Sequence, residues 1–279
     1  MKRLLLLICF LLPVLTAAAQ EGLSEPPRPP VYTAADLAVT PLEEGVWVIE
    51  TDDRTTMYLV EGTERALLID TGTHPAELDR VVRRFTRKPL FVVLTHAHYD
   101  HAGGIGFFGE IYMHPADTVL LDRLPKYEGR IRFIGGGDRF DLGGRVLEVV
   151  EMPGHTPGSV VLMDRAAGIC FSGDAFGSGQ VWLQVVPTAP VSLYLSAVRR
   201  MQRETAGGIE KIYCGHYPYQ RRPLGADYLA DMAALAQSIL DGRPTDDAPF
   251  EVESALNCAA PRVAYGGEVS IVYDPAQAR

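Results

Sequence analysis

Short apolar runs separated by turn residues follow position 40, and they predict a series of β-strands. Three of these runs occupy residues 46–49, 57–60 and 66–70, with Gly, Asp and Thr between them, which is typical of a β-meander. Over residues 75–85 the apolar positions recur at helical spacing instead, with Arg and Asp on the other face. We therefore expect this segment to be a helix that covers a sheet.

Strand and helix patterns alternate along the rest of the chain. Further strands are expected at residues 90–94, 111–113, 145–150, 160–163, 168–171 and 211–214, and a closing edge strand at 268–273. Further helices are expected at 105–108, 192–204 and 228–240. Residues 126–137 have no clear period, which indicates a loop over a site or an exposed turn. This order predicts two sheets with helices on their outer faces.

The first nineteen residues have the pattern of a signal peptide. Lys2 and Arg3 precede an apolar run, and small residues follow it before Gln20. An uncleaved membrane anchor is the alternative, but the apolar run is short for crossing a bilayer. We therefore predict cleavage of residues 1–19, export to the periplasm or the medium, and no integral membrane anchor in the mature protein. Residues 20–40 are expected to form a proline-rich leader, and residues 41–279 one folded domain.

Charge and cysteine content narrow the range of functions. The formal net charge of −9 argues against a nucleic-acid partner, because neutralising phosphates requires a basic surface. Outside the signal segment the cysteines are Cys170, Cys214 and Cys258. They can form at most one disulfide, and their wide separation fits no zinc motif. We expect them to be small buried hydrophobic residues.

Three imidazoles and one carboxylate fall within six consecutive residues, directly after the predicted strand 90–94. They are His96, His98, Asp100 and His101. In α/β proteins ligands gather beyond the carboxyl ends of buried strands, and these side chains suit Zn, Fe or Mn. The alternative is a solvated turn, but three of the seven histidines of the chain in so short a stretch favour a metal site.

Three further strand ends carry side chains that can bind metal. His155 lies between two Pro- and Gly-containing bends, Asp174 follows Gly173 at the end of a buried strand, and His216 follows the predicted strand 211–214. Asp70 also ends a strand. It could orient a histidine ligand or form a turn before a glycine, and the sequence leaves both interpretations open.

These motifs together resemble the metallo-β-lactamase-fold hydrolases, over about residues 46 to 216. The resemblance rests on H-A-H-Y-D-H at 96–101, P-G-H-T-P-G-S at 153–159, S-G-D at 172–174 and G-H at 215–216. It implies an α/β fold, a four-layer αββα sandwich, with two divalent metal ions, most often Zn2+ and otherwise Fe or Mn, at one edge. It implies that the first metal is bound by His96, His98 and His155. The second would be bound by Asp100, His101 and His216, and Asp174 would bridge the two.

Such a centre supplies its own nucleophile. A carboxylate between two cations offsets their repulsion, and metal coordination lowers the pKa of water from about 16 towards neutrality. We therefore expect a metal-bridged hydroxide, with no serine or cysteine nucleophile. Asp100 is the candidate catalytic residue, since it could also handle a proton as the tetrahedral intermediate collapses.

The substrate is expected to be a small molecule with an ester, lactone, thioester or amide bond. Export suggests β-lactam hydrolysis, but exported β-lactamases of the family usually have Cys or Ser in place of Asp174. The chain lacks the basic cluster of glyoxalase-II-like thioesterases after His216, and the tyrosine that lactonases place soon after the bridging Asp. Residues 177–190, with Trp182, are expected to form an apolar wall or lid.

Two other classes remain open. One is an iron-dependent oxidoreductase similar to persulfide dioxygenases, which the second-metal ligand Asp174 argues against. The other is a metal-binding protein without catalysis, which is unfavoured because a structural zinc site needs only four ligands.

Overall fold

The computed structural model describes residues 28–243, 246–251 and 258–279. The expected signal peptide, residues 1–19, lies outside these ranges, and its cleavage therefore stays a prediction. Among the described residues, no helix is both long enough and apolar enough to cross a membrane.

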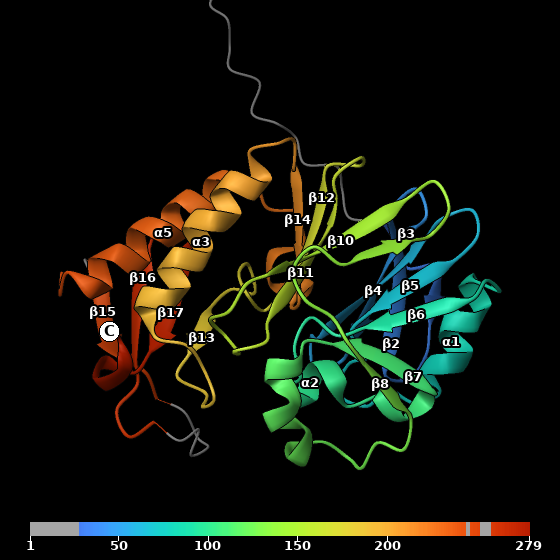
Figure 1. Cartoon of the computed structure of the whole chain (residues 1–279), viewed down its shortest axis with the longest axis horizontal. Coiled ribbons are helices and arrows are strands. Elements are labelled where there is room, and N and C mark those ends of the chain that lie inside the picture. Colours follow the sequence, from blue (N-terminus) through green and yellow to red (C-terminus); the bar gives the residue numbers. More distant parts are fainter. Residues whose placement is uncertain (1–27, 244–245, 252–257) are drawn as a thin grey trace, which may run out of the picture.

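An eight-stranded sheet forms one half of the molecule (Figure 1). Its strands lie side by side in chain order: β1 (Tyr32–Thr33), β2 (Leu37–Glu43), β3 (Val46–Thr51), β4 (Thr56–Glu61), β5 (Ala66–Ile69), β6 (Leu90–Val93), β7 (Glu110–Met113) and β8 (Arg130–Phe133). Neighbours are antiparallel from β1 to β5 and parallel from β5 to β8. The predicted meander is therefore confirmed.

Two expectations about this sheet are wrong. The strands β1 and β2 lie partly inside the range 20–40, which was expected to be a leader. Leu37 and Val39 of β2 are buried in the core, so this segment belongs to the sheet. Residues 126–137 contain β8, where only a loop or turn was expected. This strand is at the sheet edge and three of its four residues are exposed, so no apolar alternation marks it.

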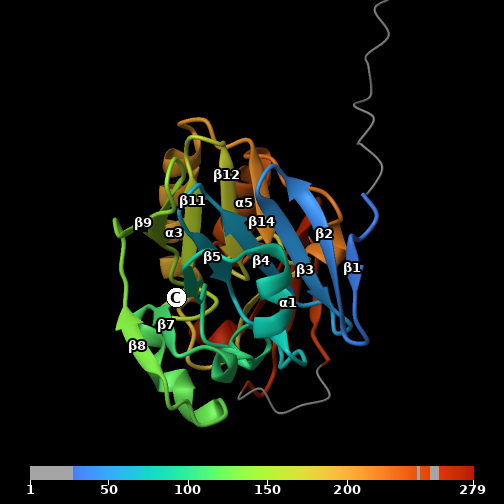
Figure 2. The same cartoon turned by 90° about the vertical axis from the view of Figure 1, so that its right-hand side faces the viewer.

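A five-stranded sheet faces the first one. Its strands in spatial order are β14 (Lys211–Cys214), β12 (Ile169–Gly173), β11 (Val160–Asp164), β10 (Val146–Glu151) and β9 (Arg139–Asp141). Viewed from the side of the first sheet, this second sheet lies behind it (Figure 2). Apolar side chains of both sheets form one core between them, among them Tyr58, Leu67 and Ile69 from the first sheet and Leu147, Leu162 and Phe171 from the second.

Helices cover the outer faces of both sheets. The first sheet is covered by α1 (Leu78–Phe85), and the second by α3 (Val191–Thr205) and α5 (Asp227–Leu240), which lie on the opposite side of the molecule in Figure 1. The four-layer αββα sandwich is therefore confirmed. The other helical segments are α2 (Tyr99–Ala102), η1 (Ile105–Phe107), η2 (Pro115–Arg123), α4 (Tyr217–Gln220) and η3 (Pro275–Gln277).

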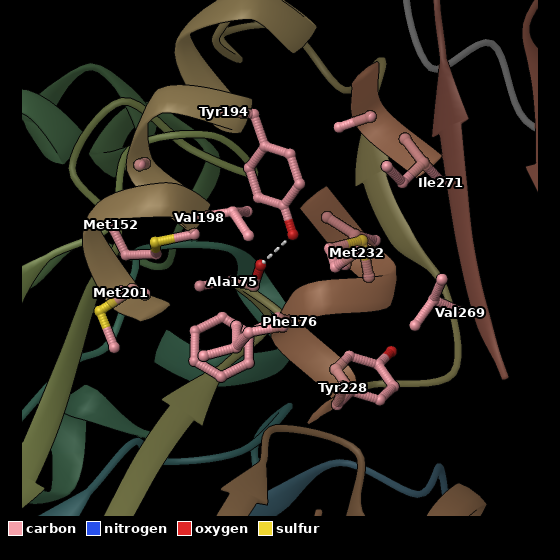
Figure 3. Packing of buried hydrophobic residues seen from close by; sticks show 14 of the residues in the cluster. Met152, Ala175, Phe176, Tyr194, Val198, Met201, Tyr228, Met232, Val269 and Ile271 are labelled. Carbon is pink, nitrogen blue, oxygen red and sulfur yellow. Dashed lines mark hydrogen bonds between the residues drawn. The ribbon is translucent and has the colours of Figure 1, made fainter. Parts of the chain in front are cut away.

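A third sheet packs against α5. Its order is β13 (Val181–Leu183), β17 (Val269–Tyr273), β16 (Arg262–Gly266) and β15 (Asp246–Pro249). The strand expected at 268–273 is present, but it lies between β13 and β16 and is not an edge strand. Its Val269 and Ile271 pack beside Tyr228 and Met232 of α5 (Figure 3).

The same core fixes the chain just after β12. Ala175 and Phe176 are buried, and the hydroxyl of Tyr194 on α3 donates a hydrogen bond of 2.9 Å to the carbonyl oxygen of Ala175 (Figure 3). The residue before them, Asp174, is thereby held at the end of its strand.

Phe171 offers a test of the core between the two large sheets. Its ring is buried, with centroids 5.0 Å from Tyr58 and 6.0 Å from Tyr213. Phe171→Ala should lower the free energy of unfolding by about 3 to 5 kcal/mol, because it removes buried contacts and leaves a cavity. The exposed Phe133 provides a matched control, and Phe133→Ala should change this free energy by less than about 0.5 kcal/mol. Urea unfolding of both variants measures the difference, and equal losses would contradict this description of the core.

Candidate metal centre

All seven side chains predicted as metal ligands lie at one end of the facing sheets. His96 and His98 follow β6, and Asp100 and His101 lie in α2 directly after them. His155 lies in the turn between β10 and β11, whereas Asp174 follows β12 and His216 follows β14. The ligands therefore come from both sheets. A hydrogen bond of 2.8 Å from Val160 N to Thr95 O joins the two sheets beside them.

His96, His98 and His155 form the first group, and their ligand atoms lie within 4.8 Å of one another. The Nδ1–H of His155 donates to Trp182 O at 2.8 Å, which leaves a lone pair on its Nε2. This Nε2 is 2.8 Å from His98 Nδ1. The Nε2 of His96 is buried and has no hydrogen-bond partner among the described residues. Three imidazoles thus direct free nitrogens to one place, as a metal site requires.

Asp100, His101, Asp174 and His216 form the second group, again with ligand atoms within 4.8 Å of one another. The Nε2 of His216 is 3.4 Å from Asp100 Oδ2 and 3.3 Å from Asp174 Oδ2. The Nε2 of His101 is 3.6 Å from Asp100 and 3.5 Å from Asp174. Two carboxylates and two imidazoles therefore surround a second position.

Asp174 lies between the two groups. Its Oδ2 is 3.7 Å from His155 Nε2 in the first group, in addition to its contacts with the second. Space for this carboxylate depends on Gly215, where a Cβ atom would lie 2.3 Å from Asp174 Oδ1. The carboxylate of Asp174 therefore lies within reach of both groups, as the predicted bridging role would require.

Hydrogen bonds behind four of the five imidazoles fix the orientation of their rings. Asp70 accepts from His101 Nδ1 at 2.9 Å and from the backbone N–H and hydroxyl of Thr95 at 2.7 and 2.8 Å. Since the Thr95 proton goes to Asp70, the 3.1 Å contact between Thr95 Oγ1 and His96 Nδ1 requires His96 to donate. His216 Nδ1 donates to Arg54 O at 3.1 Å. Of the two interpretations left open for Asp70, orientation of a histidine is confirmed.

The carboxylates and imidazoles of the second group shift one another's pKa values. Burial raises the pKa of both carboxylates, but His216 and His101 outweigh it, holding the pKa of Asp174 well below its usual value and that of Asp100 at about 2. Burial lowers the pKa of both imidazoles, but the carboxylates outweigh it and raise the pKa of His216 to about 11 and that of His101 well above its usual value. The two carboxylates therefore favour positive charge in the second group. A divalent cation would supply this charge and would displace the protons from His101 and His216.

Two imidazoles of the first group, His96 and His98, are instead uncharged. Burial lowers the pKa of His96 and His98, and the neighbouring imidazoles lower it further, to about 3 for His98. Both rings are neutral at pH 7, which is the form that binds metal. The two groups together fit a pair of divalent cations, three imidazoles around one and a mixed set around the other.

Other predicted or plausible site residues fall outside the groups. His114 is 3.5 Å from Glu151 and is not part of either group. Cys170 and Cys214 are free and buried, as expected, whereas Cys258 is free but only half-buried. Ser178 was not identified from the sequence, although its hydroxyl donates to Asp174 Oδ1 at 2.9 Å. A serine in a Gly-rich turn carries no signal for such a role.

A cavity of about 820 Å³ opens beside the second group. Its lining includes ligands of both groups, the segment 178–185 with Trp182, and aromatic residues from three distant segments: Tyr99, Tyr219 and Tyr265. Part of the segment 177–190 lines the cavity as predicted, but only Trp182 of β13 and Val185 are apolar there, whereas Ser178 and Gln180 are polar. Nothing in the sequence indicated that the turn between β16 and β17 would face the same cavity.

Solved structures with a similar fold include metallo-β-lactamases. That of Erythrobacter litoralis superposes with a TM-score of 0.59 at 21% sequence identity, covering 74% of this chain and 99% of that one. At this level of identity the similarity concerns the fold alone.

Similar curated proteins include two hydrolases. The chain is 32% identical to the acyl-coenzyme A thioesterase MBLAC2 of Gallus gallus over 222 residues, which are 63% of this chain and 79% of that protein. It is 27% identical to the hydroxyacylglutathione hydrolase of Aeromonas hydrophila over 165 residues, which are 57% of this chain and 60% of that protein.

A family model described as the metallo-beta-lactamase superfamily matches residues 51–216. This range covers more than half of the chain and contains all seven clustered side chains. The chain therefore belongs to the metallo-beta-lactamase superfamily.

Proposed function

We propose that this protein is an exported hydrolase with two divalent metal ions, most often Zn2+ in such centres, that cleaves the acyl bond of a small ester or thioester. The observation that carries the proposal is the position of Asp174, whose carboxylate lies near His155 of the first group and His216 of the second. One cation would need only one group, so this position favours a two-metal hydrolase over an oxidoreductase with a single iron. His96, His98 and His155 would hold one ion, and Asp100, His101 and His216 the other, with Asp174 between them.

The cavity and the relatives together support an acyl substrate. Aromatic rings from Trp182, Tyr219 and Tyr265 line the space beside the ligands, and such surfaces bind apolar groups. Arg123 is the one Lys or Arg among the residues that line this cavity, which argues against a polyphosphate as the reacting group. A similar protein is an acyl-coenzyme A thioesterase, which places thioesters ahead of lactones and amides.

In the proposed reaction, Asp100 and the residues behind the imidazoles would have different roles. When bound, the two cations would lower the pKa of a water molecule and polarise the substrate carbonyl. Asp100 lines the cavity beside His216, so its carboxylate is placed to take a proton from the attacking water and return it to the leaving group. The hydrogen bonds that three imidazoles donate to Asp70, Trp182 O and Arg54 O would keep these rings fixed during the reaction.

Asp174→Ala tests the two-metal assignment. The purified protein should hydrolyse a short acyl thioester, lose this activity with a chelator and regain it with Zn2+. Asp174→Ala should lower kcat/KM by more than about 100-fold, because even residues behind metal ligands contribute about 10- to 100-fold. The exposed Asp231 on α5 provides a matched control, and Asp231→Ala should keep full activity.

The same assay distinguishes the alternatives. A panel of acyl thioesters, acyl esters, lactones and a chromogenic cephalosporin is measured with the metal-loaded protein. Turnover of the cephalosporin alone would replace the proposal with β-lactam hydrolysis, and a single bound iron with oxygen consumption would replace it with an oxidoreductase. Unchanged activity of Asp174→Ala would contradict the bridging role.

Trp182 tests the acyl-binding wall. Its indole lines the cavity, whereas its contact with His155 is made by the backbone carbonyl and survives substitution. Trp182→Ala should therefore reduce kcat/KM for an octanoyl thioester by roughly tenfold, about 1.4 kcal/mol of lost apolar contact, and change the acetyl thioester little. The ratio of the two rates is the measurement. The other tryptophan, Trp47, packs on Phe85 away from the cavity, and Trp47→Ala should leave this ratio unchanged.

A further inference from the structure

Asp117 is a buried carboxylate that the proposed reaction does not use. It lies in η2, only 1% exposed, and it belongs to neither ligand group. Its Oδ2 accepts from the backbone N–H of Ala97 at 3.0 Å and from the hydroxyl of Thr156 at 2.8 Å. Its Oδ1 accepts from the backbone N–H of Gly158 at 2.6 Å.

These three donors belong to the two segments that carry the first imidazole group. Ala97 lies between His96 and His98, and Thr156 directly follows His155. The two segments come from different sheets and are separated by more than fifty residues in sequence. A single carboxylate therefore ties both sources of the first group to one point.

Gly158 approaches Asp117 so closely that no side chain fits at position 158. A Cβ atom at residue 158 would lie 2.6 Å from Asp117 Oδ1 and 2.8 Å from the backbone nitrogen of Asp117, so only glycine permits this approach. Burial raises the pKa of Asp117, and the hydrogen bonds from Thr156, Ala97 and Gly158 oppose that rise. A buried carboxylate is tolerated only with such partners, so the contacts are specific.

We infer that Asp117 is a positioning residue that sets the affinity of the first metal site. It fixes the backbone on both sides of the ligands, in the way that Asp70 fixes His101 in the second group. This inference rests on the proposed two-metal centre, because it assigns Asp117 to one of the two ions. It predicts that the loss of Asp117 weakens binding of one ion and leaves the other in place.

Asparagine at position 117 makes the strongest test because it preserves volume. The two carboxylate oxygens face backbone N–H groups on opposite sides, Ala97 on one and Gly158 on the other. An amide has only one oxygen, so in either orientation its NH2 group faces one of these donors. Asp117→Asn should therefore release one ligand segment without creating a cavity, and Asp117→Ala should release both.

The test is a zinc titration of the metal-free protein against a chromophoric chelator. Wild type should bind two Zn2+ ions. Asp117→Asn should weaken one of them by about 10-fold and Asp117→Ala by about 100-fold, with the second affinity unchanged. Thr156→Val removes one of the three hydrogen bonds to Asp117, together with the contact between Thr156 and Ser159, and should weaken the same ion about threefold. Cadmium NMR, with one resonance for each site, identifies which ion is lost.

Two control variants separate positioning from general destabilisation. Asp164 is another buried carboxylate, and its Oδ2 lies 3.0 Å from Nε of Arg145. It makes no contact with the two ligand segments, so Asp164→Asn should leave both zinc affinities unchanged. Asp70→Ala serves as a comparison with a different pattern: it should weaken the second ion most, because it removes the acceptor of His101 Nδ1, and also the first ion through Thr95 and His96. If Asp117→Ala does not fold, Asp117→Asn and Thr156→Val decide.

The outcomes distinguish the inference from the proposal beneath it. Wild type that binds no zinc, or only one ion, would overturn the two-metal centre itself. Wild type that binds two ions, with Asp117→Asn matching both affinities within twofold, would overturn the role of Asp117 alone. Equal weakening of both ions would also overturn it, since a residue with a merely structural role would have that effect.

Discussion

The carboxylate of Asp174 is buried between two sets of imidazoles, and the arrangement of the chain around it follows from the cost of placing charge there. An ionised carboxylate away from water is tolerated only when cations or strong donors surround it. Here His216, His101 and the hydroxyl of Ser178 lie around it, and His155 approaches from the other side. Together with Asp174, these residues come from four separate segments, so the site cannot form until both sheets are in register. Assembly of the fold and assembly of the charge cluster are therefore one event.

Rigid surroundings make this register reproducible. The chain after Asp174 enters a core closed by Tyr194, and the chain before His96 is joined to the second sheet by the hydrogen bond between Val160 and Thr95. Behind the rings, carboxylates and carbonyl groups settle which nitrogen carries the proton. A ring free to rotate would present its N–H to a cation as often as its lone pair. Fixing the tautomer in the scaffold makes a metal site out of a group of histidines.

The parts of this structure that sequence reasoning could reach are those with a local signature. The ligand stretch after β6 has its donors within six residues, and the meander and helices α3 and α5 have clear periods. Long-range pairing leaves no such trace. The edge strand β8 is stabilised by cross-strand pairs of Arg130 and Arg132 with Glu110, and it reads as a polar loop. Ser178, Asp117 and the pairing of β13 with β17 likewise depend on partners that only the fold brings together.

The clustered side chains all lie in the region that matches the family model, whereas part of the cavity lining lies beyond it. The ligands all fall within residues 51–216, where the superfamily model matches. The cavity beside them is completed by Tyr219 from α4 and by Tyr265 and Ser270 from the third sheet, which lie beyond that region. Membership of the superfamily therefore accounts for the clustered side chains but not for the shape of the cavity beside them. The strand β13 joins the third sheet and also carries Trp182, whose carbonyl accepts from His155 and whose indole lines the cavity. In the proposed reaction, a change in the third sheet would therefore affect both a metal ligand and the surface that contacts the substrate.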